Sequence, residues 1–163
     1  MAWLRSSLKS KMFILRDLFN NNVLMAAAIA WAIAQAVKVP LEYLRTHRWN
    51  WALLFRAGGM PSSHSALVTG VAHGIGLHYG FDTPSFAIAA ALAIIVVYDA
   101  TGIRRQAGKH AALINAMLRD LAGGHPLEEE QLREVLGHTP LEAMAGMLLG
   151  LAIAQLDWAL FSG

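Results

Sequence analysis

Two short stretches of the chain carry residue types that suit phosphate chemistry. The first, GGMPSSHSA, contains Pro61-Ser62-Ser63-His64, and the second, GHTPLEAMAG, contains His138 four residues before Glu142. A turn of small residues that carries hydroxyls and a histidine suits the binding of an oxyanion. A histidine near a carboxylate suits a nucleophile whose ring is held by an orienting partner. Together with basic residues elsewhere in the chain, these stretches suggest phosphate-ester chemistry at a membrane surface. The basic residues are Lys38, Arg56, Arg104 and Arg105.

The composition indicates that a membrane surrounds the elements that position these residues. Of 163 residues, 56% are hydrophobic and 15% are charged, whereas about 25% are charged in ordinary soluble domains. Between Arg56 and Asp99 the only formal charge is Asp82. The chain has no cysteine, which excludes disulfides and thiolate chemistry. Basic and aromatic residues do not alternate as nucleic-acid binding favours, so we expect no nucleic-acid partner.

Four apolar segments predict the fold class, which is all-α. We expect an integral membrane helical bundle of about four membrane helices plus amphipathic surface helices, in a single domain over 1–163. The predicted segments are 23–37, the stretch from the PSSH turn to about 79, 84–98, and 139–161. Each is close to or shorter than the ~20 residues of a full span, so tilt or local thinning would complete it. The buried helices of a soluble bundle are the competing interpretation.

Two further regions predict helices at the membrane surface. Residues 1–21 combine apolar and basic side chains, which would lie on opposite faces of an interfacial amphipathic helix. A basic tail is the alternative. Residues 100–138 form a polar insertion with predicted helices at 110–122 and 128–136. Within the apolar segments, three pairs of small residues predict close helix contacts. The pairs are Gly70 with Gly74, Gly76 with Gly80, and Gly146 with Gly150.

Alternating segments bring the candidate residues to one side of the membrane. Lys38 follows the first segment and the PSSH turn begins the second. Asp99 follows the third segment, and His138 begins the fourth. The end of an odd segment and the start of an even one lie on the same side, so all these groups face one way. The topology therefore predicts one shared site.

Three stretches of the sequence resemble those of a known family, the divergent small branch of the type-2 phosphatidic acid phosphatase superfamily. The resemblance rests on GGMPSSHSA, on YDATGIRRQAGKHAALIN and on GHTPLEAMAG, and it covers nearly all of 35–150. The superfamily carries Pro-Ser-Gly-His where this chain has Ser63 in place of glycine, and it has aspartate where this chain has Glu142. Lys38 lacks the Arg-Pro that follows in the superfamily, and no Ser-Arg pair precedes His138 at the usual spacing.

The resemblance implies a role for each catalytic residue. His138 would attack phosphorus and form a phosphohistidine, Glu142 would orient its ring, and His64 would protonate the leaving oxygen as general acid. A plain capping box formed by Thr139 and Glu142 is the alternative for the carboxylate. The alternative for each histidine is a residue at a helix start.

The remaining candidates would bind the phosphate. Serine hydroxyls and N–H groups at a helix start bind phosphate oxygens, and arginine suits phosphate through its bidentate geometry. Asp99 would pair with one of the arginines. For the cations, snorkelling to lipid headgroups is the alternative. The substrate-binding candidates are Lys38, Ser62, Ser63, Asp99, Arg104, Arg105 and Lys109.

The predicted function is metal-independent dephosphorylation of a lipid phosphate monoester or pyrophosphate, with no cofactor and no metal ligand set. Phosphatidic acid, phosphatidylglycerophosphate and polyprenyl pyrophosphate are the candidate substrates. We expect a multi-pass protein of a cell membrane, with a bacterial inner membrane as the predicted location, and a small bundle of this kind is compatible with a homo-oligomer. A non-catalytic protein that binds or translocates phospholipid, or a structural membrane scaffold, is the alternative. Basic residues leave the orientation open.

Overall fold

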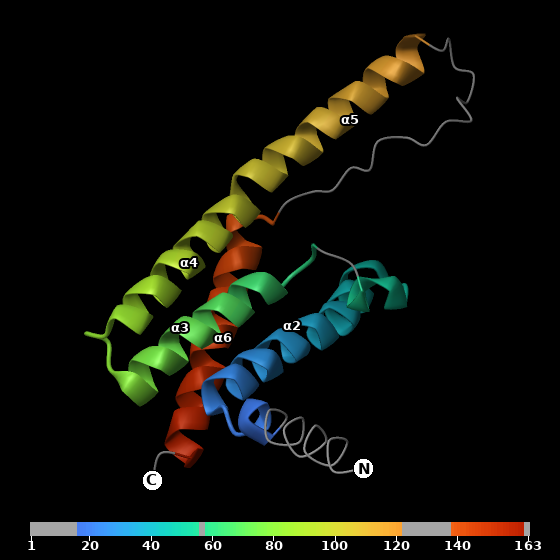
Figure 1. Cartoon of the computed structure of the whole chain (residues 1–163). Helices are drawn as coiled ribbons and strands as arrows, with labels where there is room; N and C mark the ends of the chain where they lie inside the picture. Colours follow the sequence, from blue (N-terminus) through green and yellow to red (C-terminus); the bar gives the residue numbers. More distant parts are fainter. Residues whose placement is uncertain (1–15, 56–57, 122–137, 162–163) are drawn as a thin grey trace, which may run out of the picture.

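The computed structural model describes residues 16–55, 58–121 and 138–161, and every regular element within these ranges is helical. The all-α fold class is therefore confirmed. α3 lies at the centre and packs against α2, α4 and α6, whereas α5 continues from α4 and extends beyond the bundle (Figure 1). The elements are α2 (Asn22–Thr46), η1 (Trp51–Leu54), α3 (Ser63–Tyr79), α4 (Pro84–Thr101), α5 (Ile103–Leu121) and α6 (Pro140–Phe161).

Local capping signals set where three of these helices begin. The side chain of Ser62 accepts a hydrogen bond from the backbone N–H of Ser65 at the start of α3. Thr83 caps α4 in the same way, and Pro84 occupies the first turn, where its missing N–H costs nothing. Thr139 caps α6. The predicted starts of all three helices are confirmed.

The prediction that the first segment ends at Val37 is wrong. α2 continues through Pro40 to Thr46 and ends where His47 adopts a left-handed conformation with φ of 54°. A proline removes one helical hydrogen bond, which membrane helices tolerate when the freed group finds another partner. Lys38 therefore lies within the helix and does not end it. Its side chain is buried in the bundle.

The insertion after the third segment differs from the prediction in its helix boundaries. α4 ends at Thr101 instead of Tyr98, and α5 begins at Ile103, well before the predicted start at 110. Only Gly102 separates the two helices. The predicted helices at 128–136 and over most of 1–21, as well as Ala122, lie outside the described residues.

Small side chains pack the helices of the bundle together. Within the described part of the chain, the buried apolar residues are alanines except for Val23 and Val39. A Cβ added at Gly70 would lie 3.3 Å from the backbone of Ala27 on α2, and one added at Gly146 or Gly150 would meet backbone carbonyls of α3. These glycines therefore lie at close helix contacts, as predicted. Gly76 instead faces the ring of Phe81 in the loop that follows α3.

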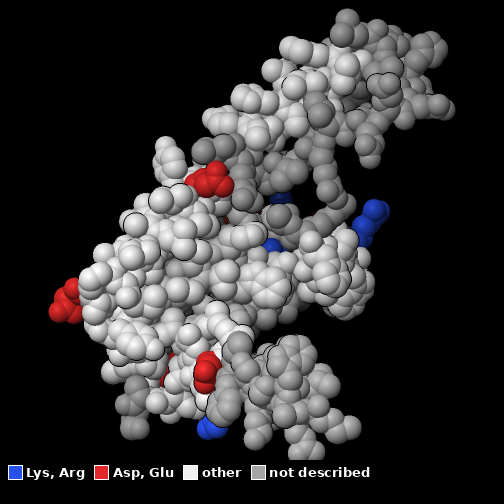
Figure 2. Space-filling model, viewed as in Figure 1, with Lys and Arg blue, Asp and Glu red and all other residues white. Residues whose placement is uncertain are grey.

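Large apolar side chains point outward, which is the pattern of a bundle embedded in lipid. Among the residues that the structure describes, three helical stretches are long and apolar enough to cross a membrane: α2, residues 84–118 and α6. The central helix α3 has 17 residues. Most of the described surface in Figure 2 is uncharged. Exposed apolar residues of α4 include Ile88, Leu92, Ile94 and Ile95. The protein is an all-α membrane helical bundle.

Candidate active site

Four helix segments bring the two sequence stretches together at one end of the bundle. α3 runs antiparallel to α2 and parallel to α6, so the start of α3 lies beside the start of α6 and the second half of α2 (Figure 1). The backbone N–H of Ser62 donates to the carbonyl of Glu142 at 2.9 Å. The N–H of His138 donates to the carbonyl of Ala100, near the end of α4, at 3.0 Å. The convergence predicted from alternating segments is therefore observed for these residues.

His138 and Glu142 form a pair across the first turn of α6. The imidazole Nδ1 of His138 lies 3.2 Å from Oε2 of Glu142. The same carboxylate oxygen accepts the N–H of Thr139 at 2.9 Å, and the Thr139 hydroxyl accepts the N–H of Glu142 at 3.3 Å. The helix cap and the contact with the histidine considered for Glu142 thus occur at once, because one oxygen completes the capping box and also contacts the ring.

This geometry orients the ring. A carboxylate oxygen accepts hydrogen bonds, so the contact favours the tautomer of His138 that carries its proton on Nδ1. His138 is only 5% exposed, and its backbone N–H donates to the carbonyl of Ala100 on α4. The ring is thereby held in place, as a nucleophile or base needs.

Lys38 is a buried cation on α2, only 2% exposed. Its ammonium group donates to Oε1 of Gln35 and to the hydroxyl of Ser63, the latter at 3.3 Å. The carboxylate of Glu142 also acts on this charge electrostatically. An ammonium group has three donors, and two are used by the described residues. Lys38 can therefore give one hydrogen bond to an anion at the start of α3.

Gln35 connects this lysine to the loop after α2. Its amide nitrogen donates to the carbonyl of Leu54 in η1 at 2.8 Å, while its oxygen accepts from Lys38. Beside it, stacked rings of Tyr43, Trp49 and Trp51 cover the end of α2. Exposed tryptophans of this kind are typical of the membrane–water interface.

The PSSH turn packs tightly on α6. Ser62, Ser63 and Ser65 are buried, and the hydroxyl of Ser65 donates to that of Ser62 at 3.0 Å. A Cβ on Gly146 would meet the carbonyl of Ser62. Glycine at this position lets the start of α3 approach α6 closely enough for the Ser62–Glu142 bond.

The other predicted site residues lie on α3, α4 and α5. His64 follows Ser63 on the first turn of α3, with its side chain exposed. Asp99 is half-buried and precedes the residue whose carbonyl binds His138. The backbone of α5 includes three further candidates whose side chains lie outside the described part of the chain. These are Arg104, Arg105 and Lys109.

Sequence reasoning missed two polar residues, the half-buried Gln35 and the buried Asn115. Gln35 is the one polar residue of an alanine-rich segment and lies one turn before Lys38, and a polar side chain within a membrane helix signals a partner. Asn115 is 2% exposed on α5, whose other face is apolar. Its polarity at a buried helical position was the available signal.

The described residues offer no cluster of three or more histidine, aspartate or glutamate side chains that could hold a metal ion. His138 and Glu142 are a pair, with Lys38 as the neighbouring charge. The donors gathered here suit an anion better than a cation.

Comparison with known proteins identifies a family and a relative. A model of the Divergent PAP2 family matches residues 19–153. The uncharacterized membrane protein YuiD of Bacillus subtilis (strain 168) is 36% identical over 148 residues, which cover 84% of this chain and 94% of YuiD. No solved structure matches the chain. The residues that the family model matches include Lys38, the PSSH turn, His138 and Glu142.

Proposed function

The chain belongs to the Divergent PAP2 family, and on this premise we propose that it hydrolyses the phosphate of a membrane lipid through a phosphohistidine. The observation that carries the proposal is the contact of the buried His138 with the half-buried Glu142, whose carbonyl accepts a backbone hydrogen bond from the PSSH turn. A buried lysine on the opposite side of that turn adds positive charge. A nucleophile, its orienting carboxylate and an anion-binding turn are thus gathered in one place.

In the proposed reaction, Nε2 of His138 attacks phosphorus and displaces the alcohol or phosphate leaving group. Glu142 stabilises the imidazolium that develops, because its Oε2 accepts from Nδ1. His64 gives its proton to the leaving oxygen. Water then attacks the phosphohistidine and gives a proton to His64, which breaks the P–N bond, releases inorganic phosphate and restores both histidines to their starting states.

The phosphate would be bound by groups that surround the start of α3. Lys38 supplies one ammonium N–H, and helix N-terminal N–H groups bind anions well. Three further cations on α5 would stabilise the negative charge that develops on the phosphate during the reaction: Arg104, Arg105 and Lys109. Asp99 would hold one of the arginines in place. Removing one donor of this kind from a transition state typically costs ~10²–10³-fold in rate.

The proposed substrates are a phosphatidic acid, a phosphatidylglycerophosphate or a polyprenyl pyrophosphate. Each presents a phosphate at the headgroup level, and the exposed, stacked tryptophans near the site support this proposal, since such residues are typical of the membrane interface. A cell membrane, such as a bacterial inner membrane, is the proposed location. A homo-oligomer and a surface insertion over 100–138 belong to the same proposal, within one domain over 1–163.

The test is phosphate release from these lipids by the purified protein in detergent, with EDTA present. We expect hydrolysis to persist in the chelator, because the described residues lack a carboxylate cluster. His138→Ala should lower the rate by about 10³-fold or more. His64→Ala should lose less with a good leaving group, since such a group needs little help from an acid.

The opposite results would change the assignment. Activity lost in EDTA and restored by a divalent ion would overturn the metal-independent mechanism. A folded His138→Ala protein with full activity would remove the nucleophile. Lipid binding without any hydrolysis by the natural sequence would favour a phospholipid-binding or translocating protein, which needs the cations but no nucleophile.

A further inference from the structure

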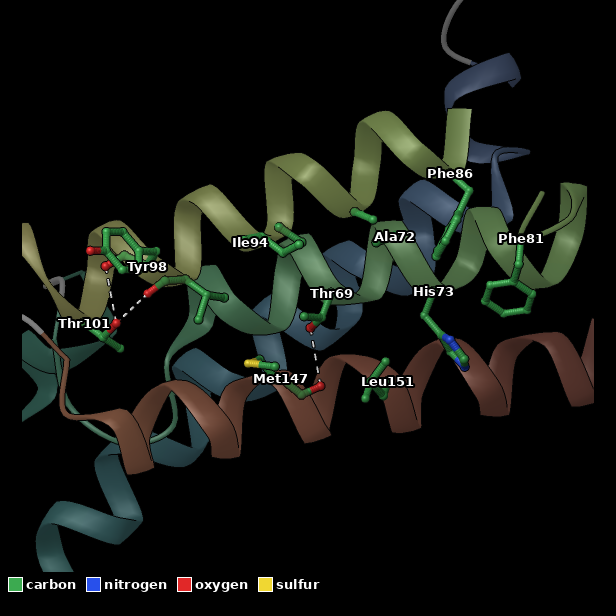
Figure 3. A pocket seen from close by; sticks show the side chains of 13 residues that line it. Thr69, Ala72, His73, Phe81, Phe86, Ile94, Tyr98, Thr101, Met147 and Leu151 are labelled. Carbon is green, nitrogen blue, oxygen red and sulfur yellow. Dashed lines mark hydrogen bonds between the residues drawn. The ribbon is translucent and has the colours of Figure 1, made fainter. Parts of the chain in front are cut away.

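An apolar groove runs along the bundle between α3, α4 and α6. Its cavity volume is about 490 Å³, within the ~300–1,000 Å³ range of ligand sites. α3 forms its floor, and α4 and α6 form its two walls (Figure 3). The lining side chains that matter here are Thr69, Ala72, Ala90, Ala93, Met147 and Leu151.

One end of the groove adjoins the candidate active site through all three helices. On α4 it ends at Thr101, which follows Ala100, the residue whose carbonyl accepts the N–H of His138. On α6 it reaches Met147, little more than one turn beyond Glu142. On α3 the hydroxyl of Thr69 donates to the carbonyl of Ser65, within one turn of the PSSH serines.

The other end lies near the start of α4. There Phe81 and Phe86 meet edge to face with ring centroids 5.1 Å apart, and Figure 3 shows both at the end opposite to Tyr98 and Thr101. From Phe86 to Thr101 the helix rises about 22 Å, at ~1.5 Å per residue. Half of a bilayer's hydrocarbon core is about 15 Å. The groove is therefore longer than one leaflet is thick.

We propose that this groove holds a single hydrocarbon chain of the phosphorylated lipid, with its phosphate at the His138 end. The proposal rests on the proposed function and deepens it, since it defines the substrate as a lipid with a long chain. The occupant follows from the lining, which is apolar apart from a few hydroxyls and His73, and from the polar site at one end only.

The groove would act by orientation instead of by hydrophobic transfer. A lipid chain is already surrounded by hydrocarbon in the membrane, so entering an apolar groove removes no surface from water. A chain fixed along about 22 Å of α4 nevertheless holds the phosphate at one place and angle. Misplacement of a substrate by about 1 Å can cost ~10²-fold in rate.

The test fills the groove with an added ring. Ala90→Trp on α4 and Leu151→Trp on α6 place tryptophan on opposite walls. The control is Ile95→Trp, because Ile95 is 64% exposed and does not line the groove. The substrates are hexadecyl phosphate, which has one long chain, and water-soluble 4-nitrophenyl phosphate, which has none.

We expect both groove variants to lower kcat/KM for hexadecyl phosphate by about 10- to 100-fold. Their kcat/KM for 4-nitrophenyl phosphate should stay within about twofold, and Ile95→Trp should resemble the natural protein with both substrates. Full activity of both variants on hexadecyl phosphate would overturn the proposal. A parallel loss with both substrates would also overturn it, because the ring would then act on the fold.

A binding measurement separates this proposal from the proposed function. An alkyl phosphate with a diazirine at the end of its chain should label peptides of α3, α4 or α6 that line the groove. Ala90→Trp should abolish that labelling, and His138→Ala should leave it intact. If the protein hydrolyses nothing but the labelling follows this pattern, only the catalytic assignment fails. If hydrolysis occurs and labelling is spread over the lipid-facing surface, only the groove assignment fails.

Discussion

The carboxylate of Glu142 makes two contacts that separate substitutions can test. Its Oε2 accepts from Nδ1 of His138 at 3.2 Å and from the N–H of Thr139 at 2.9 Å. Glu142→Gln keeps an oxygen acceptor for the cap but removes the negative charge opposite the imidazolium. Thr139→Ala removes the hydroxyl that accepts the N–H of Glu142, while both carboxylate contacts remain.

The magnitudes follow from the kinds of hydrogen bond involved. A hydrogen bond to a charged group contributes about 1.5–3 kcal/mol, and a neutral one about 0.5–1.5 kcal/mol. Glu142→Gln should therefore cost about 1–2 kcal/mol of stabilisation of the imidazolium, which is roughly a 5- to 30-fold loss of kcat. Thr139→Ala should cost about 0.5–2 kcal/mol of stability as a lost helix cap, with kcat nearly unchanged in the folded protein.

The assay measures lipid-phosphate release and thermal denaturation of the same detergent samples at a fixed scan rate. We expect Glu142→Gln to denature near the temperature of the natural protein and to turn over slowly. Thr139→Ala should denature earlier and turn over normally below its denaturation temperature. Normal turnover by folded Glu142→Gln would refute the reasoning, since Glu142 would then serve the helix cap alone.

Two further predictions concern topology and packing. In this cysteine-free chain, single cysteines at Arg45 and Gln106 should label from one side of the membrane and one at Asp82 from the other, and labelling of all three from the same side would contradict the bundle. Gly146→Ala should lower both activity and denaturation temperature, because its Cβ meets the carbonyl of Ser62. Overpacking of this kind costs about 1–3 kcal/mol of stability. If the denaturation temperature and the rate of hydrolysis of Gly146→Ala are unchanged, the close contact between α6 and the start of α3 is not needed for either.

The helix starts were predictable because their causes are local. Thr83 and Thr139 each precede a proline and cap the helix that follows, and both signals lie within a few residues of sequence. The meeting of helix ends was also predictable, since it follows from alternating direction alone. The alternating direction of the segments predicts that Lys38 lies near the PSSH turn, and this prediction needs no knowledge of side-chain contacts.

The end of α2 was not predictable, because the residues that stabilise it lie far away in sequence. Lys38 looks like the charge that ends an apolar segment, yet its ammonium group donates to Ser63, which lies 25 residues further on. Gln35 is bound to Leu54, which lies 19 residues away. The groove was hidden for a similar reason, because its existence depends on the spacing of α4 and α6. Neither helix carries a sequence signal for that spacing.

The placement of polar side chains argues for a working site over a purely structural bundle. The rest of the buried interior consists mainly of alanine and glycine, which hold membrane helices together without buried charge. A buried ion is costly in such surroundings, and an apolar replacement is often equally stable. The buried Lys38 and His138 therefore add nothing that packing alone requires. Their concentration at one end of an apolar groove is expected if the protein binds a molecule with an anionic head and a hydrocarbon tail.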